Sequence, residues 1–186
     1  LAFIGPECDC ELKELYTTVT NDDLFVRRRS IRQLLSESIA DTTPFRNRLR
    51  QAITYEKIQK VAAEHAKGRR LYVGSTNLDT KRLVVWDVGA IASRGPTPET
   101  QEMIVNVLLA SAAIPGFFPS VRFNVEIDGR QYEELHVDGA VTRALFFRTP
   151  HVEPEKREAF GPNSLYGSNM YLLVAGKIYA DPEGVT

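Results

Sequence analysis

The sequence has little cysteine, no long apolar run and almost no net charge. Its two cysteines, Cys8 and Cys10, stand one residue apart, which suits neither a bridge between them nor a zinc site. No apolar run approaches the roughly 20 residues that span a bilayer. A formal net charge of -1 gives no electrostatic reason to bind nucleic acid. We therefore expect no disulfide framework, no zinc site, no transmembrane helix and no nucleic-acid partner.

The remaining composition is typical of a globular domain, with 43% hydrophobic and 25% charged residues among 186. The chain starts at Leu1, inside apolar sequence, and shows no signal peptide. We expect a piece of a longer protein without its native N-terminus, so its cellular location is not predicted. The basic run Arg27–Arg29 with Arg32 predicts a solvated helix face. Transient contact with a membrane surface is the alternative.

Hydrophobic periodicity divides the chain into two regions. From about residue 7 to residue 68 the spacing is helical, with Thr43 and Thr54 as N-caps, Pro44 at a first helical position and Gly68 as a stop. From 69 to 186 the pattern changes: 70–76 and 82–88 predict a hairpin, Thr97 caps a helix over 98–112, and 132–137 and 171–175 predict strands. We expect one domain over 1–186, a three-layer α/β/α sandwich with a mixed central sheet.

The segment from Leu108 to Ala140 joins a helix end to two predicted strands and closes on Asp138-Gly139-Ala140. A carboxylate at the C-terminal end of a buried strand stands where open α/β sheets place their chemistry. Gly139 permits a positive φ for a sharp exit, and the small Ala140 permits close approach of another backbone. Asp-Gly is also a common turn dipeptide, so a turn is the alternative to a catalytic aspartate. His136 shares the face of Asp138 and is predicted to be a packed core histidine.

Residues 110–119 (ASAAIPGFFP), followed by Asp138-Gly139-Ala140, resemble the downstream half of a patatin-like phospholipase domain. Residues 76–79 (TNLD) and 86–91 (WDVGAI) resemble the paired strands that precede it in bacterial members, so a bacterial source is expected. The resemblance implies a serine acyl hydrolase that cleaves carboxylic esters of lipids through a Ser-Asp dyad and needs no cofactor. It makes Asp138 the base and Gly139 with Ala140 the rest of the D-G-[GA] motif. Ile114, Pro115, Phe117 and Phe118 then form a possible wall of the acyl pocket, although core positions are the preferred interpretation of the two phenylalanines.

The nucleophile of this family stands in G-x-S-x-G, and no serine in the sequence has glycine on both sides at that spacing. Ser93 has Gly95 after it but Ile91 before it, and Ser75 lacks both flanking glycines, so Ser75 is read as a strand serine. The glycine-rich oxyanion loop is also absent. A carboxylate with an ordinary pKa near 3.9 is a weak base, which burial among apolar neighbours strengthens.

Three functions follow as hypotheses. The first is a hydrolase fragment that holds only the aspartate and is inactive alone; the second is an inactive lipid-binding module with the same fold. The third, a small-molecule α/β domain unrelated to lipids, gains weight if no apolar groove leads to Asp138. A missing N-terminal part would also expose a sheet edge, so we expect association through that edge.

Overall fold

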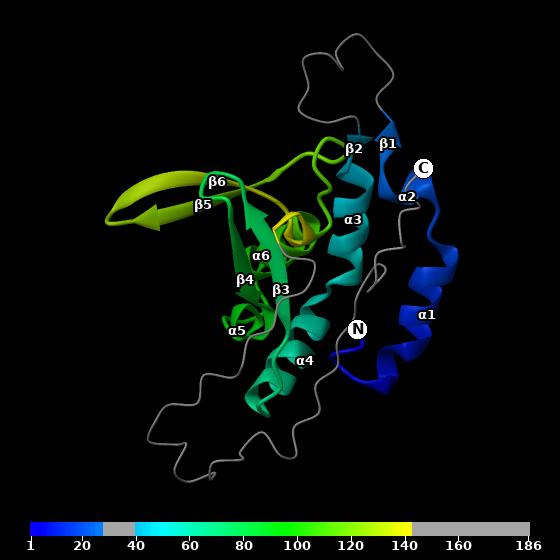
Figure 1. Ribbon diagram of the computed structural model, residues 1–186. Helices are drawn as coiled ribbons and strands as arrows, with labels where there is room; N and C mark the ends of the chain where they lie inside the picture. Colours follow the sequence, from blue (N-terminus) through cyan, green and yellow to red (C-terminus); the bar gives the residue numbers. More distant parts are fainter. Residues whose placement is uncertain (28–39, 143–186) are drawn as a thin grey trace, which may run out of the picture. The chain divides into compact units, whose positions relative to one another are not determined.

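The computed structural model describes residues 1–27 and 40–142 (Figure 1). They fall within one compact unit, Leu1–Arg143, and a second unit, Ala144–Thr186, lies outside the described residues. The strand predicted over 171–175 and most of the basic run lie outside them as well. None of the helices in the described part is long and apolar enough to cross a bilayer.

The described part of the N-terminal region is mainly helical, as the periodicity predicts, but it also contains two short strands that the sequence did not predict. The 3-10 helix η1 (Pro6–Cys8) leads into α1 (Asp9–Thr18) and α2 (Asn21–Leu24), and the short strands β1 (Val26–Arg27) and β2 (Ala40–Asp41) pair antiparallel. Helix α2 begins with a capping box, in which Thr20 and Asp23 bond each other's backbone N–H groups. An ion pair from Glu11 to Lys57 joins α1 to α4.

Helices α3 (Thr43–Ala52) and α4 (Tyr55–Ala66) follow. The cap of α3 is Thr42 rather than Thr43, because the Asp41 carboxylate accepts from both the backbone and the hydroxyl of Thr43 and fixes that residue in the first turn. Thr54 caps α4, as predicted, and accepts from Lys57 N at 3.3 Å. Gly68, with a φ of 95°, ends α4 in a conformation that glycine adopts readily.

Strands β3 (Tyr72–Asn77) and β4 (Arg82–Asp87) form the predicted hairpin. Asn77 shapes its turn, since its side-chain oxygen accepts from the backbone N–H groups of Asp79 and Thr80, each at 2.9 Å. Asp87 then caps a short helix, α5 (Val88–Ala92), that the sequence patterns did not indicate.

Helix α6 (Pro98–Ser111) supplies five of the eleven buried residues of the core cluster. Thr97 caps it, as predicted, and accepts from Thr100 N at 3.2 Å. Its buried side chains meet one face of the sheet, where Trp86 and Phe123 stack with ring centroids 4.8 Å apart. The same core cluster includes fully or largely buried residues of α4, α5, α6 and β5: Ile58, Val88, Ile91, Ile104, Val105, Val107, Leu109 and Val121.

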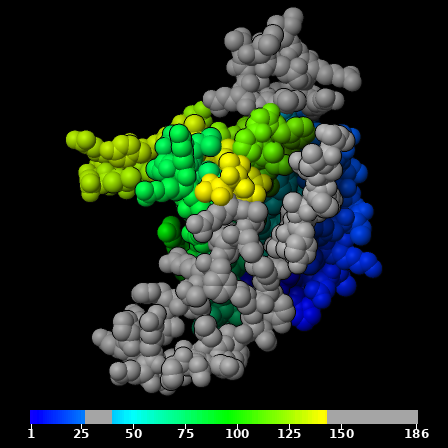
Figure 2. Space-filling view, in the orientation of Figure 1, coloured from blue at the N-terminus to red at the C-terminus, as the bar shows by residue number. Residues whose placement is uncertain are grey.

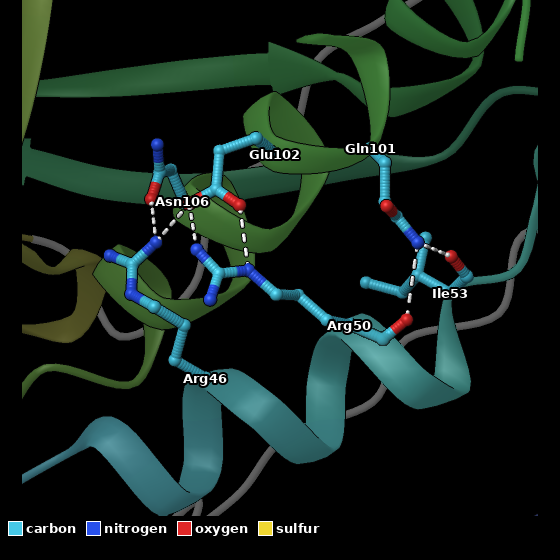
Figure 3. Close-up of polar contacts among 6 residues, drawn as sticks. All are labelled: Arg46, Arg50, Ile53, Gln101, Glu102 and Asn106. Atoms are coloured by element: carbon cyan, nitrogen blue, oxygen red, sulfur yellow. Dashed lines mark hydrogen bonds and ion pairs between the residues drawn. The ribbon is translucent and has the colours of Figure 1, made fainter. Parts of the chain in front are cut away.

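Helix α3 is fastened to α6 by charged and polar side chains (Figure 3). The Glu102 carboxylate accepts from Arg46 and, at 2.9 and 3.0 Å, from Arg50. Gln101 donates to the carbonyl oxygens of Arg50 and Ile53 at the end of α3. These bonds satisfy carbonyls that a helix end leaves unpaired.

The second hairpin joins β5 (Val121–Ile127) to β6 (Arg130–Asp138), and the sheet order is β4-β3-β6-β5. The chain is therefore α/β, as predicted. Every pairing in the described part is antiparallel; the strand predicted over 171–175 lies outside it, so the mixed character of the sheet stays a prediction. Within each of the two hairpins the direction follows from the short turn, because parallel neighbours need a long crossover connection.

Candidate functional site

Asp138 is the last residue of β6, and its backbone is held from two sides. Its N–H donates to the carbonyl of Ala113, just past the end of α6, at 2.9 Å. Its own carbonyl accepts from the hydroxyl of Thr76 on β3 at 3.0 Å. The hydroxyls of Thr76 and Thr142 are 2.7 Å apart, which ties the turn after Asp138 to the same strand. Helix α6 and strand β3 thus fix the position of the carboxylate.

The Asp138 side chain is half-buried, and its two oxygens are in different situations. Oδ1 accepts from the backbone N–H of Ala140 at 2.8 Å, which makes Asp138 the cap of the 3-10 helix η3 (Gly139–Val141). Within the part of the chain that the structure describes, Oδ2 makes no hydrogen bond. One oxygen orients the carboxylate and the other is left to accept a proton.

Gly139 has the close-approach role that was predicted for Ala140. Gly139 is buried and is not among the glycines with positive φ. A methyl carbon there would lie 2.8 Å from the carbonyl oxygen of Gly74 on β3, so the chain needs glycine for close approach. Ala140 is exposed. The error arose because a glycine after a strand serves either purpose and its spacing does not distinguish them.

A buried chain of hydrogen bonds lies on the same face of the sheet as Asp138. Ser75 stands directly opposite Asp138 in the β3–β6 register. Its Oγ is 2.8 Å from Nδ1 of His136, and Nε2 of His136 is 3.1 Å from a carboxylate oxygen of Glu134. The indole N–H of Trp86 also donates to the Ser75 Oγ at 2.8 Å. The core position predicted for His136 is confirmed, with none of its surface exposed.

This hydrogen-bonded network has the residue types of a Ser-His-Glu triad, but its serine is not accessible. Ser75 has no exposed surface, and its oxygen already accepts from Trp86. A nucleophilic oxygen needs an open approach for the ester carbonyl. The interpretation of Ser75 as a strand serine is therefore the one that the geometry supports. The sequence analysis did not identify this hydrogen-bonded network. The spacing of Glu134, His136 and Asp138 at every second residue did indicate that the three side chains share one face of the strand.

The turn after α6 carries the residues predicted to wall an acyl pocket. Ile114 is 54% exposed and Phe117 37% exposed. Pro115 is exposed too, and Phe118 is half-buried. The rings of Phe117 and Phe118 pack edge-on against each other and against Phe25 after α2. Phe117 is thus not a core residue but part of a surface aromatic cluster.

Two apolar grooves lie away from Asp138. One of about 410 Å³ runs between α1 and α3, and a second of about 280 Å³ continues from it toward α4 and α6. Their linings are mainly apolar and share Leu15, Leu49 and Ala52. Asp138 is not among the residues that line them. In residues 1–27 and 40–142 no group of three or more histidine, cysteine or acidic side chains is placed to hold a metal ion.

Comparison with known families agrees with this arrangement. The model of the patatin-like phospholipase family matches residues 8–150, which is more than half of the chain and includes Asp138. The chain belongs to the patatin-like phospholipase family. No curated protein matches it significantly. Membership in this family indicates, in broad terms, an acyl hydrolase of lipids. The α/β fold and the family resemblance read from the sequence are both confirmed.

Proposed function

We propose that this patatin-like chain supplies the aspartate of a Ser-Asp dyad that hydrolyses carboxylic esters of lipids. The observation that carries the proposal is the asymmetry of the Asp138 carboxylate at the end of β6. Oδ1 is oriented by the Ala140 N–H, and Oδ2 has no partner among the described residues. Such a carboxylate is positioned to accept a proton from a hydroxyl that approaches from outside these residues.

The nucleophile and the oxyanion donors of this mechanism are not in the 186 residues, since no serine stands in G-x-S-x-G. A serine presented to Asp138 by polypeptide outside this sequence loses its proton to Oδ2 as its oxygen attacks the ester carbonyl. The protonated carboxylic acid then gives that proton to the leaving alcohol. Water, deprotonated by the same carboxylate, hydrolyses the acyl-serine and regenerates both groups. Covering the half-buried carboxylate would also strengthen it as a base.

Ile114 and Phe117 support a lipid substrate in this proposal. Both are exposed apolar side chains just after Ala113, the residue whose carbonyl holds the Asp138 backbone. An acyl chain lying on them would bring its ester close to the carboxylate. The same exposed apolar surface suits transient contact with a lipid surface during catalysis.

The test is hydrolysis of a short p-nitrophenyl ester by a longer natural chain that contains both this sequence and a G-x-S-x-G segment. Asp138→Asn keeps an oxygen for the Ala140 N–H and removes the base, so kcat should fall by about 10²- to 10⁴-fold with little change in thermal stability. Asp128→Asn is the matched control, because Asp128 is an exposed turn residue with a φ of 52° that asparagine tolerates. Undiminished turnover by Asp138→Asn would refute the assignment.

The alternative function, an inactive lipid-binding module, is favoured by the apolar grooves between α1 and α3. It predicts binding of a fluorescent fatty acid without ester turnover in any form of the chain. Leu49→Arg should abolish that binding, since Leu49 lines both grooves. The apolar grooves described above do not reach Asp138, which by the stated criterion favours a small-molecule domain unrelated to lipids, but the family match disfavours that function.

A further inference from the structure

The β5–β6 hairpin extends past the rest of the sheet (Figures 1 and 2). Strand β6 pairs with β3 only through His136, Val137 and Asp138, while its pairing with β5 continues to the turn at Asp128-Gly129. Strand β5 is the last in the order β4-β3-β6-β5, and its outer side has no neighbour among the described strands. An isolated two-stranded ribbon is only marginally stable in water, and a free edge is a template for another strand.

The backbone groups on that edge can be assigned from Leu135. Its carbonyl accepts from Leu78 N at 2.8 Å, and its N–H donates to the Asp79 carboxylate at 3.1 Å. Both groups of Leu135 therefore point away from β5. Its partner across the hairpin is Arg122. Because hydrogen-bonded and non-hydrogen-bonded pairs alternate in an antiparallel ladder, the N–H and C=O of Arg122 and of alternate residues after it point outward.

The outward-bonding residues of β5 are Arg122, Asn124 and Glu126, and all three are exposed. They form a self-complementary series, with a cation and an anion at equal distances on either side of an amide. When two such edges pair antiparallel about Asn124, each Arg122 meets Glu126 of the other copy and the two Asn124 residues face each other. A two-fold interface requires this kind of complementarity.

We propose that the outer edge of β5 is a dimerisation surface, on which β5 of a second copy pairs antiparallel about a two-fold axis at Asn124. The paired edges form about six inter-strand hydrogen bonds and make one continuous sheet through both copies. Dimerisation is independent of the proposed hydrolysis, and neither test depends on the other.

Charge selects this register from its neighbours. Antiparallel pairing centred on Phe123 or Val125 also aligns outward backbone groups, but it forms about four hydrogen bonds and places Asn124 opposite one of the charged residues. Arg122 already bonds Glu133 of its own hairpin at 2.6 Å, with both side chains about half exposed. In the dimer it lies between two carboxylates. Exposed ion pairs stabilise weakly, so the charges mainly fix the register.

The opposite face of β5 contributes apolar contacts to the dimer. Val121, Phe123, Val125 and Ile127 alternate with the charged residues. In the Asn124-centred register Val121 lies opposite Ile127 of the second copy, and Phe123 lies opposite Val125. Ile127 is 52% exposed in the monomer, and the dimer covers it. Cross-strand apolar pairs of this kind add to sheet stability.

Cross-linking tests both the dimer and its register. In a Cys8→Ala, Cys10→Ser form of the full chain, Asn124→Cys places two thiols across the axis with Cα atoms about 5.5 Å apart, within reach of a disulfide. Arg122→Cys is the matched control, exposed on the same face but about 14 Å from its counterpart. On mild oxidation, Asn124→Cys should form dimer at least about tenfold faster than Arg122→Cys. Equal rates, or no dimer from Asn124→Cys, would overturn the proposal.

Charge reversal gives an independent readout by sedimentation velocity over a range of concentrations. Arg122→Glu places two carboxylates opposite each other at both ends of the interface, so it should shift the monomer–dimer equilibrium toward monomer. Glu126→Arg should have the same effect, because it places two cations there. The double variant restores opposite charges in this register alone and should recover association. Failure of the double variant to associate more tightly than either single variant would contradict the two-fold pairing. Circular dichroism of each variant establishes that the hairpin remains folded.

Discussion

Replacing Gly139 with alanine tests the account of the D-G-[GA] motif most directly. The added methyl carbon would stand 2.8 Å from the carbonyl oxygen of Gly74, 2.9 Å from its carbonyl carbon and 3.3 Å from the nitrogen of Ser75. Carbon atoms in contact normally lie about 3.5–4.0 Å apart. The obstructing atoms belong to the main chain of β3, which is held between β4 and β6. They cannot rotate aside as a side chain can.

The expected cost follows from this rigidity. Inserting one carbon into a packed site costs about 1–3 kcal/mol, and a main-chain obstacle places Gly139→Ala near 2 kcal/mol. For a chain of this size that corresponds to a fall in Tm of roughly 4–8 °C. Thermal unfolding followed by circular dichroism measures it. Ala140→Ser is the matched control: it adds one atom at the exposed neighbouring residue and should change stability by about 0.5 kcal/mol or less.

Gly139→Asn separates the two explanations of the glycine. If a positive φ required it, asparagine, which tolerates that conformation, would be milder than alanine. Since the obstacle is instead the β3 backbone, the larger asparagine should destabilise more than alanine does. An asparagine variant as stable as the wild type, or an alanine variant with unchanged Tm, would refute the close-approach argument.

Two further substitutions test contacts outside the site. Gly89→Ala places a methyl carbon against the His65 side chain, 2.7 Å from its Cγ and 2.9 Å from its Cβ. The side chain must shift, so urea unfolding should show a loss of about 1–2 kcal/mol. An unchanged midpoint would contradict this packing. Glu102→Gln should cost about 1 kcal/mol at pH 7, discounted because Glu102 is partly exposed. The hydrogen bond from Arg50, with the charge of Arg46, holds the pKa of Glu102 below its usual 4.5. The stabilisation by ionised Glu102 is therefore complete above pH 4.5 and is lost as pH falls through the lowered pKa. The free energies of unfolding of the wild type and the variant should thus converge in acid. A difference in these free energies that stays constant with pH would refute the ion-pair explanation.

The sequence was most informative where local chemistry decides the structure. Thr54 and Thr97 cap the helices they were predicted to cap, and Gly68 ends α4. Such signals depend on a few neighbouring residues, so one sequence contains them. The N-cap of α3 is Thr42, one residue before the predicted Thr43, because Asp41 accepts a hydrogen bond from the backbone N–H of Thr43. Helix boundaries are sensitive to such single bonds.

Features that depend on contacts between distant segments were not predictable. The close approach of Gly139 to Gly74 joins two strands 65 residues apart in sequence, and no periodicity reports it. Phe117 was read as a core residue from its type, but it packs in a surface cluster with Phe25. The family resemblance singled out Asp138 as the expected base. The contacts that hold Asp138 in place could be seen only in the folded chain.

The buried bonds beside Asp138 indicate how a short strand pairing can hold the proposed base in position. Strand β6 meets β3 over only three residues. If the Trp86 N–H donates to Ser75, the Ser75 hydroxyl is free to donate to Nδ1 of His136, and the remaining ring N–H can bond Glu134. Every N–H and O–H donor of this hydrogen-bonded network then has an acceptor. The bonds tie β4, β3 and β6 together just before Asp138, so in the proposed dyad this hydrogen-bonded network positions the carboxylate and takes no part in the attack.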